Sequence, residues 1–214
     1  MSLPTLIAAS DHSLLVSFGH EVSLEIHRDV LRLSLLLERR RELLNIHPGY
    51  CSVLISYDPR KQESAAVESM VREALARMGT VELPAARTVE VPVEYGGADG
   101  PDLSEVARLH GIMPAEVIRI HSSAQYLVYF LGFSPGFPYL GGLPPELATP
   151  RLATPRRLVP AGSVGIGGDH TGIYPVASPG GWRIIGRTPL EIFRPDRDPL
   201  TLLEMGDYVR FVAI

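Results

Sequence analysis

The chain has 214 residues, 45% of them hydrophobic, and a formal net charge of −4 at pH 7. Acidic and basic residues are interspersed, which argues against nucleic-acid binding because that needs a basic face. No apolar run approaches the roughly 18 residues of a membrane span, and the amino terminus lacks the pattern of a secretory signal. We therefore expect a cytoplasmic protein of one large or two small domains. The single cysteine, Cys51, excludes an internal disulfide and a multi-cysteine metal site.

The first part of the chain predicts a small α/β sandwich. Ser13–Phe18 and Ser52–Tyr57 are short apolar runs typical of strands, and Ser23 suits the N-cap of a helix between them. Apolar residues that would share one face of that helix are Ile26, Val30, Leu33, Leu37 and Leu44. Ser64–Met78 predicts a second amphipathic helix, and Thr88–Val93 alternates like a third strand. Strands and helices in this alternating order favour a layered α/β structure.

Two groups of charged or titratable residues in this part lack catalytic spacing. The run Arg39-Arg40-Arg41 is either a basic docking patch or the solvated face of the first helix. Four histidines fit no metal-ligand pattern and are expected to be surface or structural residues: His12, His20, His27 and His47.

A change of pattern at Leu83–Arg87 predicts a domain boundary near residue 88. The expected organisation is an N-terminal α/β domain over residues 1–88 and a β-barrel domain over residues 89–214. Pro92 cannot donate to a ladder, so Thr88–Val93 is expected at an edge or crossing position.

The second part predicts two short helices and then many short strands, so the fold class is α+β. Leu103–His110 and Pro114–Ile120 have helix start and stop signals. Tyr126–Leu131 reads as a buried strand. Further short runs separated by glycine and proline are Val164–Ile166, Gly172–Tyr174, Arg183–Ile185, Glu191–Phe193 and Tyr208–Ala213. This spacing is typical of an all-β barrel.

The most unusual stretch is Tyr129–Gly142, in which aromatic residues alternate with glycine and proline. Surface loops are usually polar, yet this one contains Phe133, Pro135, Phe137 and Tyr139. The aromatic side chains either plug the end of a barrel or line a pocket or partner surface.

The tripeptide Ser-Pro-Gly occurs twice, at Ser134 and at Ser178. Each time proline suits the first central position of a turn and glycine the second, and an aromatic residue follows. The repetition predicts two similar loops at one end of the barrel. Trp182, in the second loop, is expected to pack in the barrel.

A second short repeat, Ala-Thr-Pro-Arg, ends at Arg151 and again at Arg156. It predicts extended chain that holds the two arginines in similar settings. Their planar guanidinium groups suit a carboxylate or a phosphate, and binding to backbone carbonyls or surface acids is the alternative.

Several familiar motifs are absent. The glycine-rich run Gly165–Gly168 lacks the Gly-Lys-Ser/Thr ending of a phosphate loop, and Lys61 is the sole lysine. The surroundings of Lys61 do not resemble a biotinylation site. Ser163 is one residue short of a nucleophile elbow and precedes a β run rather than a helix, so it is a weak nucleophile candidate.

Three titratable residues remain as candidates. Asp169 and His170 could form a carboxylate–imidazole base, although neighbours in a strand point to opposite faces; the alternative is a turn at the barrel rim. His121 either faces the cavity of Tyr139 and Trp182 or caps a helix end, where a cation is favoured.

Three segments carry a resemblance to a known family: Tyr129–Leu140, Pro160–Tyr174 and Ser178–Leu190. They resemble the B subunit of 5-oxoprolinase, whose family includes Kip-type inhibitors of a sporulation histidine kinase and the first half of allophanate-hydrolase or urea-carboxylase-type carboxyltransferase domains. The family has a histidine at the place of His121, whereas uncharged amide residues are usual near Asp169-His170. That departure weakens His170 as a shared base.

The resemblance implies a cyclophilin-like barrel in one subunit of a bacterial ATP-dependent 5-oxoprolinase, which opens 5-oxo-L-proline to L-glutamate. The implied partners are a lactamase-like A subunit together with a homologous C subunit, with ATP shared among the subunits and no metal. His121 and His170 are then the catalytic candidates. The candidates for binding substrate or partner are Phe133, Pro135, Phe137, Tyr139, Arg151, Arg156, Ser163, Asp169, Tyr174, Ser178 and Trp182. The alternatives are an inhibitor that binds a histidine kinase through the aromatic loop, and a carboxyltransferase half acting on a biotin-borne carboxyl group.

Overall fold

A computed structural model describes residues 3–214 and divides the chain into two compact units, with the division between Ala85 and Ala86. The first unit contains a four-stranded sheet with two helices, and the second contains a closed barrel of seven strands. The predicted α+β class with a β-barrel is therefore confirmed.

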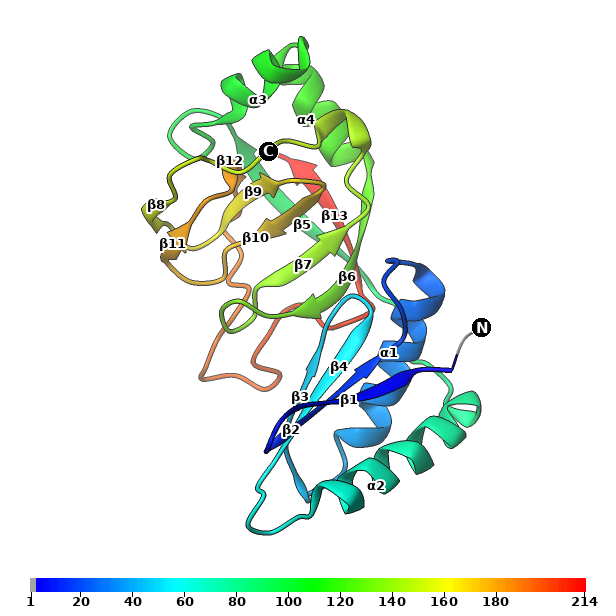
Figure 1. The fold of residues 1–214 in the computed structure, drawn as a ribbon. Helices are drawn as coiled ribbons and strands as arrows, with labels where there is room; N and C mark the ends of the chain where they lie inside the picture. The colour runs from blue at the N-terminus through cyan, green and yellow to red at the C-terminus, as the bar shows by residue number, and fades with distance from the viewer. Residues whose placement is uncertain (1–2) are drawn as a thin grey trace. The chain divides into compact units, whose positions relative to one another are not determined.

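The first unit is an antiparallel sheet in the order β1-β2-β4-β3 (Figure 1). Its elements are β1 (Thr5–Ser10), β2 (Ser13–Ser17), α1 (Leu24–Leu37), β3 (Leu43–Pro48), β4 (Ser52–Tyr57), α2 (Ser64–Arg77) and the 3-10 turn η1 (Met78–Thr80). Alternate residues of β4, namely Val53, Ile55 and Tyr57, are buried, as expected for a sheet with one apolar face. Helix α1 packs on β3 and β4 through its apolar stripe.

Helix α1 begins where the sequence indicates and ends earlier than expected. The Ser23 hydroxyl accepts a hydrogen bond from the Ile26 N–H at 3.2 Å, which confirms the N-cap. The helix stops at Leu37, and Leu44 lies on β3 with 67% of its surface exposed. Turn hydrogen bonds from Arg40 N–H to Leu37 and from Leu43 N–H to Arg40 end the helix. The run Arg39-Arg40-Arg41 therefore lies in a turn and not on a helix face.

Strands β1 and β3 were not predicted, since neither has a clean apolar alternation. All but one of the six residues of β1 are exposed, and β3 contains Asn45, His47 and Pro48. Thr88–Val93, expected as a third strand of the sandwich, belongs to the barrel of the second unit.

The second unit is built around the barrel, whose strands follow the closed order β10-β7-β6-β13-β5-β12-β9. Its elements are β5 (Thr88–Tyr95), α3 (Leu103–His110), α4 (Pro114–Ser123), β6 (Gln125–Leu131), β7 (Pro138–Gly141), η2 (Pro145–Leu147), β8 (Arg156–Val159), β9 (Ser163–Gly167), β10 (His170–Ile173), β11 (Ser178–Gly180), β12 (Arg183–Arg187) and β13 (Tyr208–Ala213). Strands β8 and β11 form a separate two-stranded sheet. Helices α3 and α4 lie next to each other and pack against barrel strands (Figure 1).

The barrel interior is filled by alternate strand residues. Val128, Val164 and Ile166 are fully buried in one cluster with Val209 and Phe211 of β13. Helices α3 and α4 add apolar residues to the same cluster. Side chains that point out of the barrel are therefore free to build a surface.

Two details of the second unit differ from expectation. Strand β5 is enclosed by β13 and β12 and is not an edge; it pairs with β12 only at Glu94 and Tyr95, so Pro92 does not interrupt that ladder. Glu191–Phe193 is no strand, and its only pairing in the described chain is an isolated bridge from Phe193 to Thr201.

The two Ser-Pro-Gly segments have different structures. Ser134 starts a turn in which the Phe137 N–H donates to the Ser134 carbonyl at 3.0 Å, with Gly136 at φ 79°. Ser178–Gly180 forms strand β11, in which Ser178 pairs with Val159. The pairing with β8 overrides the local turn preference, so the prediction of two similar loops is wrong.

The first and last strands of the barrel lie side by side. β5 and β13 pair in parallel from Thr88 opposite Tyr208 to Val93 opposite Ala213. Where both strands begin, Arg87 Nε donates to the buried Asp207 carboxylate at 3.0 Å. The barrel is thus closed by segments 120 residues apart in sequence.

Candidate functional site

The outer wall of the barrel carries a cluster of aromatic side chains, which we call the aromatic face. Its members are Phe133, Phe137, Tyr139, Tyr174 and Trp182. This cluster is separate from the barrel core. The aromatic loop thus covers the wall of the barrel and does not plug its interior.

Glycines in the wall make room for this face. In β9, Val164 and Ile166 point into the core, and Gly165 and Gly167 alternate with them. A Cβ on Gly167 would lie 2.5 Å from the indole of Trp182. A Cβ on Gly172 would lie 3.0 Å from both Phe137 and Trp182. The glycine-rich run therefore serves packing of aromatic rings.

Phe137 is the centre of the aromatic face. Its ring meets those of Tyr139, Tyr174 and Trp182 edge-on, at centroid distances of 5.2, 5.3 and 5.5 Å. Phe137 is 2% exposed, whereas Phe133 is 65% exposed and adopts a φ of 66°. Pro135 is exposed between them at the turn. The loop therefore presents Phe133 and Pro135 to solvent and anchors itself through Phe137.

The two arginines of the Ala-Thr-Pro-Arg repeat have different settings, contrary to expectation. Arg151 is exposed, and its guanidinium carbon lies 5.8 Å from the ring centroid of Trp182. It forms no ion pair with any residue from 3 to 214. Arg156 begins β8 and binds Asp102, with Nη2 to Oδ1 at 2.7 Å.

Asp102 connects Arg156 to the barrel. Asp102 is 5% exposed, and its carboxylate also accepts the Ile184 N–H at 2.6 Å. Arg156 Nη1 lies 3.5 Å from the Trp182 carbonyl. The guanidinium of Arg156 is thus committed within the protein, and Arg151 is the arginine available to a ligand at the aromatic face.

Tyr174 links the arginines to the aromatic rings. Burial raises the pKa of its hydroxyl, while a hydrogen bond from the Trp182 backbone and the charges of Arg151 and Arg156 oppose that rise. Tyr139 is close enough to affect the same pKa. The structure therefore brings together six predicted site residues: Phe133, Phe137, Tyr139, Arg151, Tyr174 and Trp182.

Asp169 and His170 do contact each other, contrary to the expectation for strand neighbours. Asp169 Oδ1 lies 2.6 Å from His170 Nδ1 because Asp169 belongs to the two-residue turn between β9 and β10. The Asp169 side chain is 80% exposed and that of His170 24% exposed. The pair lies at the surface, and Gly167 is directly opposite His170 in the ladder.

His121 lies in the barrel interior, away from the aromatic face. Its Nδ1 is 2.7 Å from the Tyr95 hydroxyl and its Nε2 is 3.0 Å from Thr171 Oγ1. Because Thr171 donates its own proton to the Gly165 carbonyl, it accepts from Nε2–H, and Nδ1 accepts from Tyr95. Complete burial lowers the pKa of His121 to about 3. This neutral, fully bonded imidazole has the setting of a structural residue.

The two candidate serines, Ser163 and Ser178, have little access to solvent. Ser163 is 2% exposed at the start of β9. The hydroxyls of Ser134 and Ser178 are buried without a hydrogen-bond partner in the described part of the chain. Because β9 is a strand and Ser163 heads no helix, the nucleophile-elbow geometry is not formed.

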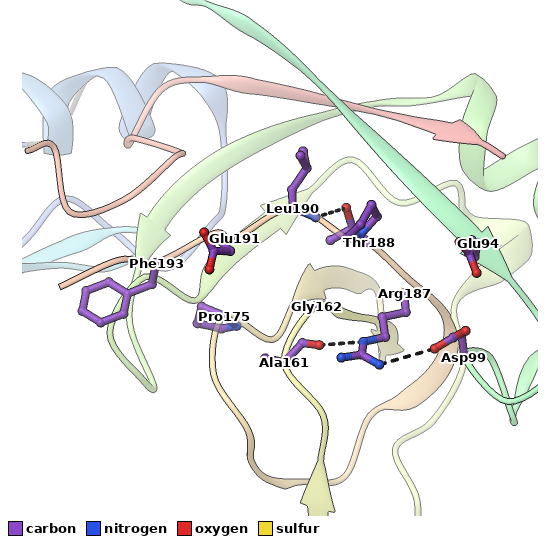
Figure 2. Close-up of a pocket in the computed structure, with 11 residues that line it drawn as sticks. Glu94, Asp99, Ala161, Gly162, Pro175, Arg187, Thr188, Leu190, Glu191 and Phe193 are labelled. Carbon is purple, nitrogen blue, oxygen red and sulfur yellow. Dashed lines mark hydrogen bonds and ion pairs between the residues drawn. The ribbon is translucent and has the colours of Figure 1, made fainter. Parts of the chain in front are cut away.

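A pocket of about 460 Å³ lies elsewhere on the second unit, and we call it the Arg187 pocket (Figure 2). Its lining includes Glu94, Asp99, Gly162, Arg187, Glu191 and Phe193. A smaller hollow of about 150 Å³ shares Asp99 and Arg187 with it and also contains Arg156 and Ser163.

Sequence reasoning missed the Arg187 pocket, since its lining comes from separated segments. Gly162 was a usable signal: it has a φ of 81°, and a Cβ there would lie 2.4 Å from the Thr188 carbonyl. Such a close approach marks where residues near 162 and 188 must meet.

Two classes of bound group receive no support from the described residues. No three histidine, cysteine, aspartate or glutamate side chains within residues 3–214 converge as metal ligands. The glycine-rich run does not fit a nucleotide phosphate, because Gly165 and Gly167 pair within the barrel ladder and Gly168 N–H donates to Thr149.

None of the helices in residues 3–214 is long and apolar enough to cross a membrane.

The fold and the sequence define the family. Residues 4–203 match the family described as carboxyltransferase domain, subdomain C and D. The chain belongs to this family, and the match includes residues of both units.

Two similar proteins are named as B subunits of 5-oxoprolinase. The chain is 42% identical to the B subunit of 5-oxoprolinase from Bacillus subtilis over 216 residues, which covers 95% of this chain and 90% of that protein. It is 47% identical to the B subunit of 5-oxoprolinase from Escherichia coli O157:H7 over 199 residues, covering 89% and 87%. Among solved structures, TTHA0988 matches with a TM-score of 0.83 at 38% identity; the match covers 94% of this chain and 40% of TTHA0988.

Proposed function

We propose that this chain is the B subunit of an ATP-dependent 5-oxoprolinase and works only with its partners. The observation that carries the proposal is the 42% identity to a protein of that name along nearly the whole of both chains. The partners are a lactamase-like A subunit together with a homologous C subunit. Together they open the lactam of 5-oxo-L-proline by adding water across its C–N bond, which yields L-glutamate, while ATP is hydrolysed.

The aromatic face is the part of this chain that we assign to the shared site. Arg151 receives the substrate carboxylate or a phosphate, since its guanidinium is exposed and unpaired among the described residues. Trp182 lies against its guanidinium, and Tyr139, whose ring packs on Phe137 as the Trp182 ring does, adds a hydroxyl to the same face. Exposed Phe133 and Pro135 offer a contact surface for a partner.

Because Arg151 and Arg156 have different settings, only one of them is suitable for a mutational test of binding. Arg156 holds the buried Asp102, so replacing it damages the fold and cannot report on binding. Arg151→Ala removes an exposed guanidinium with no ion-pair partner in residues 3–214. Arg157→Ala is the matched control, because Arg157 is also exposed and lines neither hollow.

The assay measures 5-oxoproline-dependent ADP release by a mixture of the three candidate subunits, with and without this chain. Turnover requires this chain, and Arg151→Ala raises KM about tenfold or more, the cost of one charge-assisted hydrogen bond, while Arg157→Ala leaves it unchanged. Tyr139→Phe removes the hydroxyl and keeps the ring, which stacks on Phe130, so this variant measures the contribution of the hydroxyl alone.

If turnover proceeds equally without this chain, the proposal is wrong. Inhibition of a histidine kinase by the isolated chain would then support the inhibitor hypothesis. Transfer of a carboxyl group from biotin would support the carboxyltransferase hypothesis.

A further inference from the structure

The Arg187 pocket is separate from the aromatic face: none of the five aromatic residues lines it. Its volume, about 460 Å³, lies in the range of small-molecule sites. Charged groups lie on several sides of it (Figure 2). What the pocket can hold therefore depends on which of these charges are already neutralised.

One nitrogen of the Arg187 guanidinium, Nη2, has no partner among the described residues. Its Nε donates to the Ala161 carbonyl at 2.9 Å, and Nη1 lies 3.7 Å from Asp99 Oδ1 (Figure 2). Nη2 has no hydrogen bond or ion pair with the residues that the structure describes. The contact with Ala161 fixes the orientation of the guanidinium, so Nη2 is a pre-oriented donor for an anionic group.

Glu94 is the complementary group. It lies directly opposite Arg187 in the β5–β12 ladder, so the two side chains emerge on the same face of the barrel wall. Yet Glu94 forms no ion pair with Arg187 or with any other residue in the range 3–214. Arg187 turns to Ala161 and Asp99 instead, so one carboxylate and one guanidinium N–H of the pocket have no partner among the described residues and are exposed.

The remaining acids of the pocket are paired. Asp99 faces Arg187, and Glu191 Oε2 lies 2.8 Å from Arg194 Nη1. One carboxylate is therefore left to bind a cation, and one N–H to bind an anion. A polyanion such as a nucleotide would meet three carboxylates and is disfavoured, and a purely apolar ligand would desolvate both charges without compensation.

Besides a cationic and an anionic group, the lining indicates that the ligand has an apolar part. Pro175, Leu190 and Phe193 also line the pocket. They offer contacts to a hydrocarbon side chain and none that would neutralise a second carboxylate. The pocket thus presents a site for a cation, a site for an anion and an apolar wall.

We propose that the Arg187 pocket binds a free α-amino acid with an uncharged, apolar side chain. The α-carboxylate binds Arg187 Nη2, the α-ammonium binds Glu94, and the side chain contacts Leu190 and Phe193. This ligand differs from 5-oxo-L-proline, which has no ammonium group, so the proposal does not depend on the proposed oxoprolinase activity.

The test uses the isolated full-length chain and calorimetric titration with four probes. L-Leucine carries both charges, N-acetyl-L-leucine lacks the ammonium, 3-methylbutylamine lacks the carboxylate, and L-glutamate adds a second carboxylate. We expect L-leucine to bind, and N-acetyl-L-leucine and 3-methylbutylamine each to bind about tenfold more weakly or worse, the effect of one lost charge-assisted bond. L-Glutamate should also bind more weakly than L-leucine, because its second carboxylate would lose water against the apolar wall without gaining a partner.

Variants assign each charge to its partner. Arg187→Ala should abolish the preference for L-leucine over 3-methylbutylamine, and Glu94→Gln should abolish the preference over N-acetyl-L-leucine. Arg157→Ala is the control and should change neither. Circular dichroism melting verifies that each variant is folded, and Arg187→Gln, which removes the charge but keeps an amide donor, replaces Arg187→Ala if the alanine variant does not fold.

Two results would overturn the proposal. One is no saturable L-leucine binding at millimolar concentration. The other is binding whose preference among the probes is unchanged both by the loss of the Arg187 charge (Arg187→Ala or Arg187→Gln) and by Glu94→Gln. Because neither a partner protein nor turnover enters this assay, its failure is distinct from a failure of the oxoprolinase assay.

Discussion

The guanidinium of Arg156 and the buried carboxylate of Asp102 lie 2.7 Å apart and connect β8 to the start of α3, 54 residues away in sequence. Asp102 is 5% exposed and also accepts the Ile184 N–H, so its charge is balanced within the barrel wall. The pair is the main reason why we regard Arg156 as structural and propose Arg151, and not Arg156, as the arginine that binds a ligand.

Arg156→Ala should lower the free energy of unfolding by about 2 kcal/mol, less than a fully buried pair because the Arg156 side chain is partly exposed. The cause is a buried carboxylate left with a single donor. Urea titration should show a lower midpoint with an unchanged slope. Arg157→Ala is the control, and equal midpoints for the two variants would contradict the role of the pair.

Stability of the second unit should fall as pH falls below 6.5. Unfolded His121 takes up a proton near pH 6.5, whereas the folded residue resists protonation down to a pKa of about 3. The unfolded state therefore binds more protons in this window, which costs at most about 1.4 kcal/mol per pH unit. Trp182, the only tryptophan, reports on this unit in urea titrations at several pH values.

His121→Gln should flatten that pH dependence while lowering stability at neutral pH. Nitrogen-15 NMR of the imidazole should show a protonated Nε2 and an unprotonated Nδ1 at pH 5. An imidazolium signal from folded His121 at pH 5 would contradict the assignment.

Gly167→Ala should displace Trp182, because a Cβ would lie 2.5 Å from its indole. We expect a loss of about 1–3 kcal/mol, as for overpacking, and tryptophan emission shifted to longer wavelength. Gly181→Ala is a matched control next to Trp182, since its Cβ would meet only Pro155 at 3.6 Å or more. Emission unchanged in Gly167→Ala would mean that the indole does not pack on β9.

Ser178→Ala should leave stability unchanged or raise it by up to about 1 kcal/mol, because a buried hydroxyl without a partner costs free energy. Its Oγ is buried and unbonded within the described chain. Thermal unfolding followed by circular dichroism measures the change. A clear loss of stability would show that the hydroxyl binds a group outside residues 3–214.

Local signals in the sequence predicted much of the second unit. Leu103–His110 has the predicted bounds, because Gly111 ends the helix in a left-handed conformation at φ 65°. Tyr126–Leu131 and Tyr208–Ala213 have apolar side chains that fill the barrel. In these elements local propensity and burial agree, so the sequence was sufficient.

Other features depend on partners distant in sequence. Ser178–Gly180 becomes a strand because β8 lies beside it. Leu44 is exposed on strand β3, whose sequence lacks the alternation of apolar and polar residues that would identify a strand. Arg151 and Arg156 have the same local sequence and differ only through Asp102 and Trp182. No local rule distinguishes such residues.

The parallel pairing of β5 with β13 has a consequence for synthesis of the protein. The first unit holds all its strands and helices within the first 80 residues, so it can fold while the rest is still being translated. The barrel cannot close until Tyr208–Ala213 has left the ribosome, and until then β5 and β6 each lack a neighbour. During that interval β5 and β6 each expose one unpaired edge, so chaperone dependence and aggregation should originate in the second unit.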